Sequence, residues 1–151
     1  LAGPRLPHDM AFTENYTSLN DSPLFWDPEA LKLNAHVVRM HRDLIRLRKH
    51  DAVFSQQNRN AIESSLIGQE AFALRWYGDD GDDRLGLFNF GRDYDWHPIA
   101  DPLIAPPLCK KWNLIWSSED PRYDGLGTPA FDNKNWPVPG HAAVIFATID
   151  T

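Results

Sequence analysis

The hydrophobic period of this chain changes once along its length, and that change limits the possible fold more than any other feature. Between residues 27 and 50, apolar side chains recur at helical spacing, at Leu33, Val37, Met40, Leu44 and Leu47. This spacing puts them on one face of an α-helix. Asp27 is a favourable N-cap residue, Pro28 suits the first helical position, and the basic residues near the end suit the negative end of the helix dipole. The pattern predicts one long amphipathic helix over residues 27–50.

After His50 the period becomes two, which is typical of β-strands. Alternation marks residues 71–77 and 85–90, and the polar, glycine-bearing segment 78–83 between them predicts a hairpin with a solvated tip. Residues 112–116 and 142–147 are further short strand candidates. Several short strands without a second helix predict a mainly β fold, an antiparallel β-sandwich over residues 51–151. Residues 1–26 show no sustained period and are predicted to form an irregular lead-in.

Length and charge exclude several classes of protein. The chain has 151 residues, enough for one domain but not for a (β/α)8 barrel of about 250 residues. It begins at Leu1 and is therefore expected to be a fragment of a longer protein. A net charge of -6 argues against nucleic acid or an anionic membrane as a partner. No apolar run approaches the roughly 18 residues of a membrane span, and the single cysteine, Cys109, predicts a reducing, cytoplasmic compartment.

The sequence offers no catalytic, metal or cofactor motif. His36 and His41 lie five residues apart in the predicted helix, about 140° from each other at roughly 100° per residue. The acidic segment 79–83 lacks the spacing of a calcium loop. Glu119 and Asp120 are the strongest candidates for a catalytic acid pair, yet they lie in a proline- and glycine-rich loop. We therefore predict no catalytic residue, no metal and no cofactor.

Tryptophan is unusually frequent, and it leaves two interpretations open. The indole rings can belong to a sandwich core and find hydrogen-bond partners at its edge. Alternatively, exposed rings can form flat platforms for sugars. The candidates for a carbohydrate-binding surface are Trp76, Trp96, Trp112, Trp116 and Trp136.

Several segments together resemble the C-terminal region of glycoside hydrolase family 13, the α-amylase superfamily. Residues 40–51 are similar to its last barrel helix, and residues 71–91 to the first hairpin of its C-terminal sandwich. Residues 103–107, 116–129 and 136–146 resemble the end of malto-oligosyltrehalose trehalohydrolases and of related glycogen branching enzymes. The resemblance covers about residues 27–148 and is most specific in residues 116–123.

This resemblance implies that the chain is one part of a longer enzyme and that another part carries the catalytic residues. In the family, an aspartate nucleophile and two further carboxylates act from earlier barrel strands, and no position of this chain matches those motifs. The chain is therefore expected to be a non-catalytic accessory domain that stabilises an upstream (β/α)8 barrel acting on α-glucans. An α-glucan-binding module that uses exposed tryptophans is the alternative. An independent enzyme built on Glu119 or Asp120 is a third possibility, opposed by the lack of a second carboxylate motif.

Overall fold

The computed structural model describes residues 10–12, 17–19, 32–96, 101–131 and 136–151, which fall into two compact units. In the first unit, residues 1–34, strands β1 (Met10–Phe12) and β2 (Thr17–Leu19) pair antiparallel. This pair of short strands lies in the segment that we predicted to be an irregular lead-in. The second unit, residues 35–151, holds the helix and all the other strands.

The second unit begins with helix α2 (Ala35–His50), which ends in three basic residues. The start that we predicted at Asp27 lies outside the described residues. Two short 3-10 turns, η1 (Phe54–Gln56) and η2 (Arg59–Ala61), lead from the helix into the sheet. Asn58 caps the second turn, since its side chain accepts a hydrogen bond from the backbone N–H of Asn60.

The main sheet has five antiparallel strands in the order β3-β4-β5-β9-β7. Their bounds are β3 Ile62–Leu66, β4 Ala71–Trp76, β5 Arg84–Asn89, β9 Ala143–Asp150 and β7 Lys110–Ser117. A two-stranded ribbon pairs β6 (Tyr94–Trp96) with β8 (Trp136–Val138). The prediction of a mainly antiparallel, sandwich-like β fold preceded by one helix is confirmed. Two further 3-10 turns are η3 (Asp79–Gly81) and η4 (Pro121–Tyr123).

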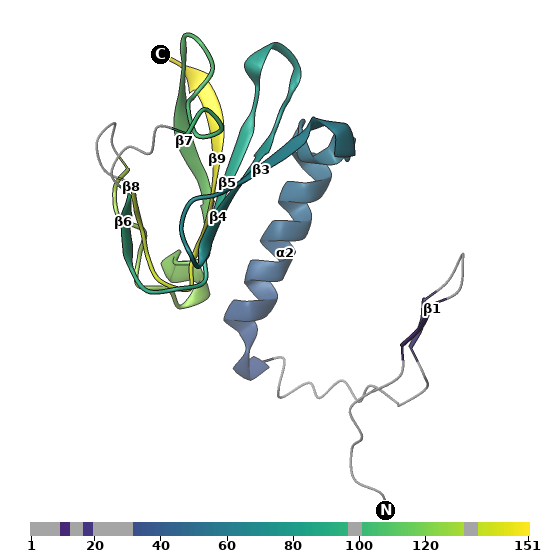
Figure 1. Cartoon of the computed structure of the whole chain (residues 1–151). Helices are drawn as coiled ribbons and strands as arrows, with labels where there is room; N and C mark the ends of the chain where they lie inside the picture. The colour runs from purple at the N-terminus through teal and green to yellow at the C-terminus, as the bar shows by residue number, and fades with distance from the viewer. Residues whose placement is uncertain (1–9, 13–16, 20–31, 97–100, 132–135) are drawn as a thin grey trace, which may run out of the picture. The chain divides into compact units, whose positions relative to one another are not determined.

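Three layers make up this unit, with the ribbon on one side of the main sheet and α2 on the other (Figure 1). The buried core lies between the sheet and the ribbon, where Leu85, Leu87 and Phe146 face Val138 of β8. Phe131 packs edge-on against Phe146, with ring centroids 4.9 Å apart. Burial of these aliphatic and aromatic groups supplies the main driving force for the fold.

The side chains of β4 point alternately to these two sides of the main sheet. Ala71, Ala73 and Arg75 are buried on the core side, whereas Phe72, Leu74 and Trp76 are half-buried on the side of α2. The hairpin of β4 and β5 is confirmed, but its acidic loop is only partly a solvated tip. Asp79 and Asp80 are exposed, yet the Asp83 residue is only 3% exposed. Asp83 is buried because Arg75, across the hairpin, donates two hydrogen bonds of 3.0 and 2.7 Å to its carboxylate.

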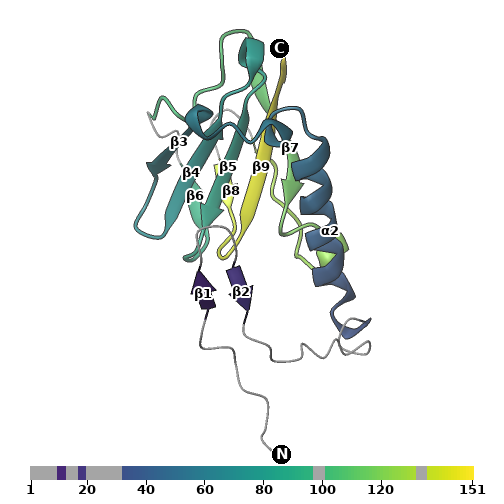
Figure 2. The ribbon, with the colours of Figure 1, turned by 90° about the vertical axis from the view of Figure 1, so that its right-hand side faces the viewer.

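Helix α2 covers only part of its side of the sheet. Figure 2 looks onto this side and shows the helix beside β9 and β7, while β3, β4 and β5 are not overlaid by it. None of the 16 residues of α2 is buried. Val37, Met40, Leu44 and Leu47 of the predicted apolar stripe are half-buried. Much apolar surface on this side of the domain therefore meets solvent.

Candidate functional site

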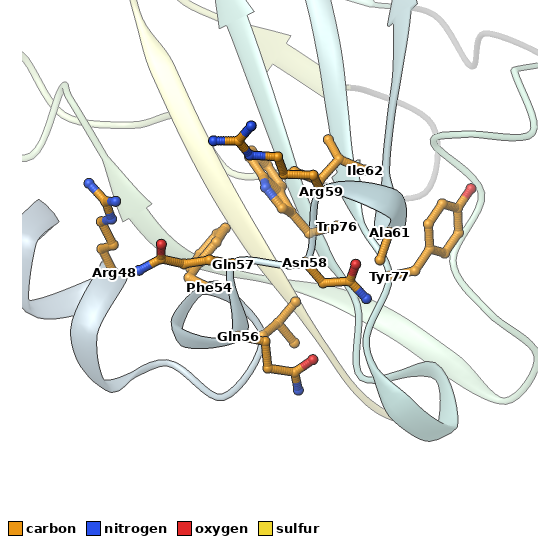
Figure 3. A pocket seen from close by; sticks show the side chains of 11 residues that line it. Arg48, Phe54, Gln56, Gln57, Asn58, Arg59, Ala61, Ile62, Trp76 and Tyr77 are labelled. Atoms are coloured by element: carbon orange, nitrogen blue, oxygen red, sulfur yellow. The ribbon is translucent and has the colours of Figure 1, made fainter. Parts of the chain in front are cut away.

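A pocket of about 270 Å³ opens where the end of α2, the turns η1 and η2 and the strand β4 meet. Trp76 and Phe54 form its apolar wall, and their rings pack edge-on with centroids 5.0 Å apart (Figure 3). Gly86 gives the Trp76 ring its space, because a Cβ at Gly86 would lie 3.1 Å from Trp76 Cζ3. The indole is thus held from two sides by its own domain.

Besides these rings and the aliphatic side chains of Val53, Ala61 and Ile62, the lining of the pocket is polar. Its lining includes the amide side chains of Gln56, Gln57 and Asn58 and the guanidinium groups of Arg48 and Arg59 (Figure 3). Gln57 has a left-handed backbone, with φ 51°, and ends the η1 turn. This reversal lets consecutive residues of one short connection surround the same space. The pocket was not predicted as a site, although one of its walls, Trp76, was a candidate.

The other candidate tryptophans do not gather around Trp76. Trp112 and Trp136 pack against the core between the sheet and the ribbon. The Trp112 indole N–H donates a 2.8 Å hydrogen bond to the Ile104 carbonyl, and the Arg75 guanidinium lies 5.4 Å from its ring centre. Trp116 packs against Tyr123 with ring centroids 6.2 Å apart. The side chain of Trp96 lies outside the described residues.

The most specific motif of the sequence, residues 116–123, ties the end of β7 to the helix. The Tyr123 hydroxyl donates a 2.8 Å hydrogen bond to the Asp43 carboxylate, and Arg39 of α2 donates one to the Arg122 carbonyl. Burial, reinforced by the bond to Asp43, raises the pKa of the Tyr123 hydroxyl. The motif therefore acts as a clamp between β7 and α2.

The two acids of this motif serve local structure. Asp120 accepts hydrogen bonds from the side chain and the backbone of Arg122, and these bonds lower the pKa of its carboxyl group. Glu119 accepts one from the backbone N–H of Leu126. Both carboxylates are thereby engaged in holding the loop, which is the role that the turn-rich sequence indicates.

The clamp gives a first testable expectation. Tyr123→Phe keeps the ring contact with Trp116 but leaves Asp43 without its hydroxyl donor, so we expect a loss of about 1.5–3 kcal/mol in the free energy of unfolding. Urea titration of the whole chain, followed by far-UV circular dichroism, measures this loss. Tyr77→Phe is the matched control, since Tyr77 donates to Glu63 at an exposed edge. An equal loss in both variants would contradict the clamp.

Neither a cluster of metal-ligating side chains nor a membrane-spanning helix occurs in the described part of the chain. Among these residues, no group of three or more His, Cys, Asp or Glu side chains is arranged to hold a metal ion. Within the same ranges, no helix has the length and hydropathy needed to span a bilayer.

A family model described as "Domain of unknown function (DUF3459)" matches residues 59–148, which is more than half of the chain. The chain belongs to this family. The DUF3459 match runs from η2 into β9 and so includes most of the main sheet and the ribbon. A DUF3459 domain is typically the C-terminal domain of an α-amylase-family enzyme. No curated protein and no solved structure was found to match the chain.

Proposed function

We propose that this DUF3459 domain is the non-catalytic C-terminal accessory domain of an α-glucan-processing glycoside hydrolase family 13 enzyme, and that it stabilises the catalytic barrel. The parent is of the malto-oligosyltrehalose trehalohydrolase or 1,4-α-glucan branching enzyme type, because residues 116–129 and 136–146 resemble the ends of those enzymes. The observation that carries the stabilising role is the apolar surface that the second unit leaves open.

This surface is a patch at one end of β3, β4 and β5, and we call it the open patch. It consists of Leu66, Phe72, Phe88 and Phe90. Leu66 is 85% exposed and Phe90 is 63% exposed. The Phe72 ring stacks on Phe88 and Phe90, with centroids 4.8 and 5.9 Å away. A contiguous exposed group of large apolar side chains is typical of an interface with another domain.

The helix supports the same role. The apolar stripe of α2 is only half-buried, and Ile45 on its flank is exposed. An amphipathic helix is stable when a larger body covers its stripe. A barrel that packs on α2 and on the open patch would bury both surfaces together, and each large side chain newly covered would contribute roughly 2 kcal/mol.

The test uses the complete product of the gene, with the double change Leu66→Ser and Phe90→Ser. In the isolated chain we expect the free energy of unfolding to change by no more than about 0.5 kcal/mol, because both side chains are exposed. In the complete enzyme we expect the half-life of starch-hydrolysing or branching activity at elevated temperature to fall at least about tenfold, because the interface loses two anchors.

Leu108→Ser is the control, since Leu108 is also a highly exposed apolar residue, at 93%, but precedes β7 outside the open patch. Its half-life should equal that of the unchanged enzyme. Equal losses in the control and the double variant would contradict the stabilising role. A gene product without an α-glucan-acting domain would contradict the assignment to this enzyme class.

A further inference from the structure

The pocket at Trp76 is chemically unlike the open patch, although both lie on the same side of the sheet. Trp76 pairs with Ile62 and Arg84 at one end of β4, whereas Leu66 and Phe72 pair with each other at the other end. The open patch is almost purely apolar, and the pocket combines an indole wall with amides and guanidinium groups. A surface of mixed chemistry indicates a small polar ligand and not a packed protein core.

We propose that this pocket binds a pyranose ring of a neutral oligosaccharide, with Trp76 as the stacking wall and with Gln57, Asn58 and Arg59 as hydrogen-bonding groups. The site goes beyond the stabilising role of the domain. Only the identity of the sugar, an α-glucan, rests on the proposed function.

The indole wall suits a sugar because the ring is fixed before a ligand arrives. Phe54 packs at 80° to Trp76, and the missing side chain of Gly86 lets the indole lie close to β5. An aromatic face carries partial negative charge, so it attracts the C–H groups on the face of a pyranose. A ring held in place loses little entropy when a ligand stacks on it.

The polar groups suit hydroxyls. The side chains of Gln56, Gln57, Arg48 and Arg59 are exposed, and within the described residues the structure gives them no hydrogen bond or ion pair. Amides both donate and accept hydrogen bonds, and guanidinium groups only donate. Together they can satisfy adjacent hydroxyl groups, each of which is both donor and acceptor.

The charge of the lining and the volume of the pocket restrict the class of ligand further. The lining contains two arginines and no carboxylate, so it does not attract a cation. A small inorganic anion would use the arginines but leave Trp76, Phe54 and Ile62 without a partner. The volume of about 270 Å³ is near the lower limit for ligand pockets, and it suits a single ring at the end of a chain.

The experiment titrates the 151-residue chain with maltoheptaose at millimolar concentration, by isothermal calorimetry and by ¹⁵N–¹H spectra. We expect saturable binding, with shifts confined to residues 54–62 and 76–77. Gln57→Ala and Arg59→Ala should each weaken binding by about fivefold, the effect of roughly one hydrogen bond. Trp76→Ala should abolish it. Because Trp76→Ala could disturb the sheet, the two exposed substitutions decide the result.

Matched controls are Gln69→Ala and Arg92→Ala, which change the same residue types at exposed positions outside the pocket. They should leave the affinity unchanged. Binding that the controls weaken as much as the pocket variants would overturn the proposal, as would the absence of binding to any sugar. Inorganic phosphate that binds with the same shifts, while maltoheptaose does not, would also overturn it.

Cellohexaose separates this inference from the proposed function. Binding of cellohexaose but not maltoheptaose would support a sugar site while contradicting its α-glucan identity. If no sugar binds but the open-patch variant still inactivates faster on heating, the pocket proposal fails and the stabilising role stands.

Discussion

Arg75→Met is expected to lower the free energy of unfolding by about 3–5 kcal/mol, the loss that follows when one partner of a buried ion pair is removed. Arg75 and Asp83 are both buried, and the closest distance between their charged groups is 2.7 Å. The substitution leaves the Asp83 carboxylate without its counter-charge inside the hairpin. Urea titration of the whole chain, followed by circular dichroism and tryptophan fluorescence, measures the change.

Arg75 also fixes a connection that has no regular structure. Its guanidinium donates to the carbonyls of Leu103 and Ala105 at 3.0 and 2.7 Å. It also lies over the rings of Tyr77 and Trp112, 5.0 and 5.4 Å from their centres. With the Pro102 carbonyl, which accepts a further hydrogen bond of 3.4 Å from Arg75, six polar or aromatic groups would lose a partner at once. The predicted effect therefore lies at the upper end for a single substitution.

Two variants test this explanation. Arg92→Met changes the same residue type at an exposed position and should alter stability by no more than about 0.5 kcal/mol. The double change Arg75→Met and Asp83→Leu removes both charges and should recover part of the loss, since an apolar pair does not leave a buried charge. A double variant less stable than Arg75→Met alone would contradict the ion-pair explanation.

Phe146→Ala is expected to lower the free energy of unfolding by about 3–5 kcal/mol, because the substitution opens a cavity in the core. Phe146 lies on the interior strand β9, is 1% exposed, and contacts the rings of both Phe131 and Trp136. Phe131 and Trp136 lie across the core from β9, and we expect their rings to fill only part of the cavity left by Phe146. The urea concentration at the midpoint of unfolding should fall, while the slope of the free energy of unfolding against urea concentration should change little.

Ile149→Ala provides the comparison within the same strand. Ile149 is 41% exposed near the end of β9, so its truncation should cost well under half as much as that of Phe146. Equal costs at the two positions would show that the core is not centred between the main sheet and the ribbon.

The helix and four strands of the main sheet could be predicted because their signals are local. The helical spacing from Val37 to Leu47 marks α2, and alternation marks β4 and β5. The candidates at 112–116 and 142–147 correspond to β7 and β9. Five of the described strands were missed. β3 is an edge strand with mostly exposed residues, and β1, β2, β6 and β8 have three residues each, too few for a period to show.

The candidate sites were less accessible to sequence reasoning. The pocket draws its lining from a helix end, two turns and a strand, which adjoin only after β4 has paired with β3. The five candidate tryptophans look alike in sequence. The structure gives Trp112 a hydrogen bond to Ile104, places Trp136 on Phe146, and makes Trp76 part of the lining of a pocket.

The amino-acid sequence alone determined the class of the domain, since hydrophobic periods and turn residues act over a few positions. Only the tertiary structure decided which side of each strand becomes core. Both faces of β4 and β5 carry apolar groups. Leu85 packs in the core with Val138 of the ribbon, whereas Phe90, directly after β5, stacks on Phe72 and is exposed. Which side becomes core depends on which distant segment covers each face of the sheet. The physical reason is that the free energy of burial depends on how much apolar surface the whole fold removes from water, and residue type alone does not fix that area.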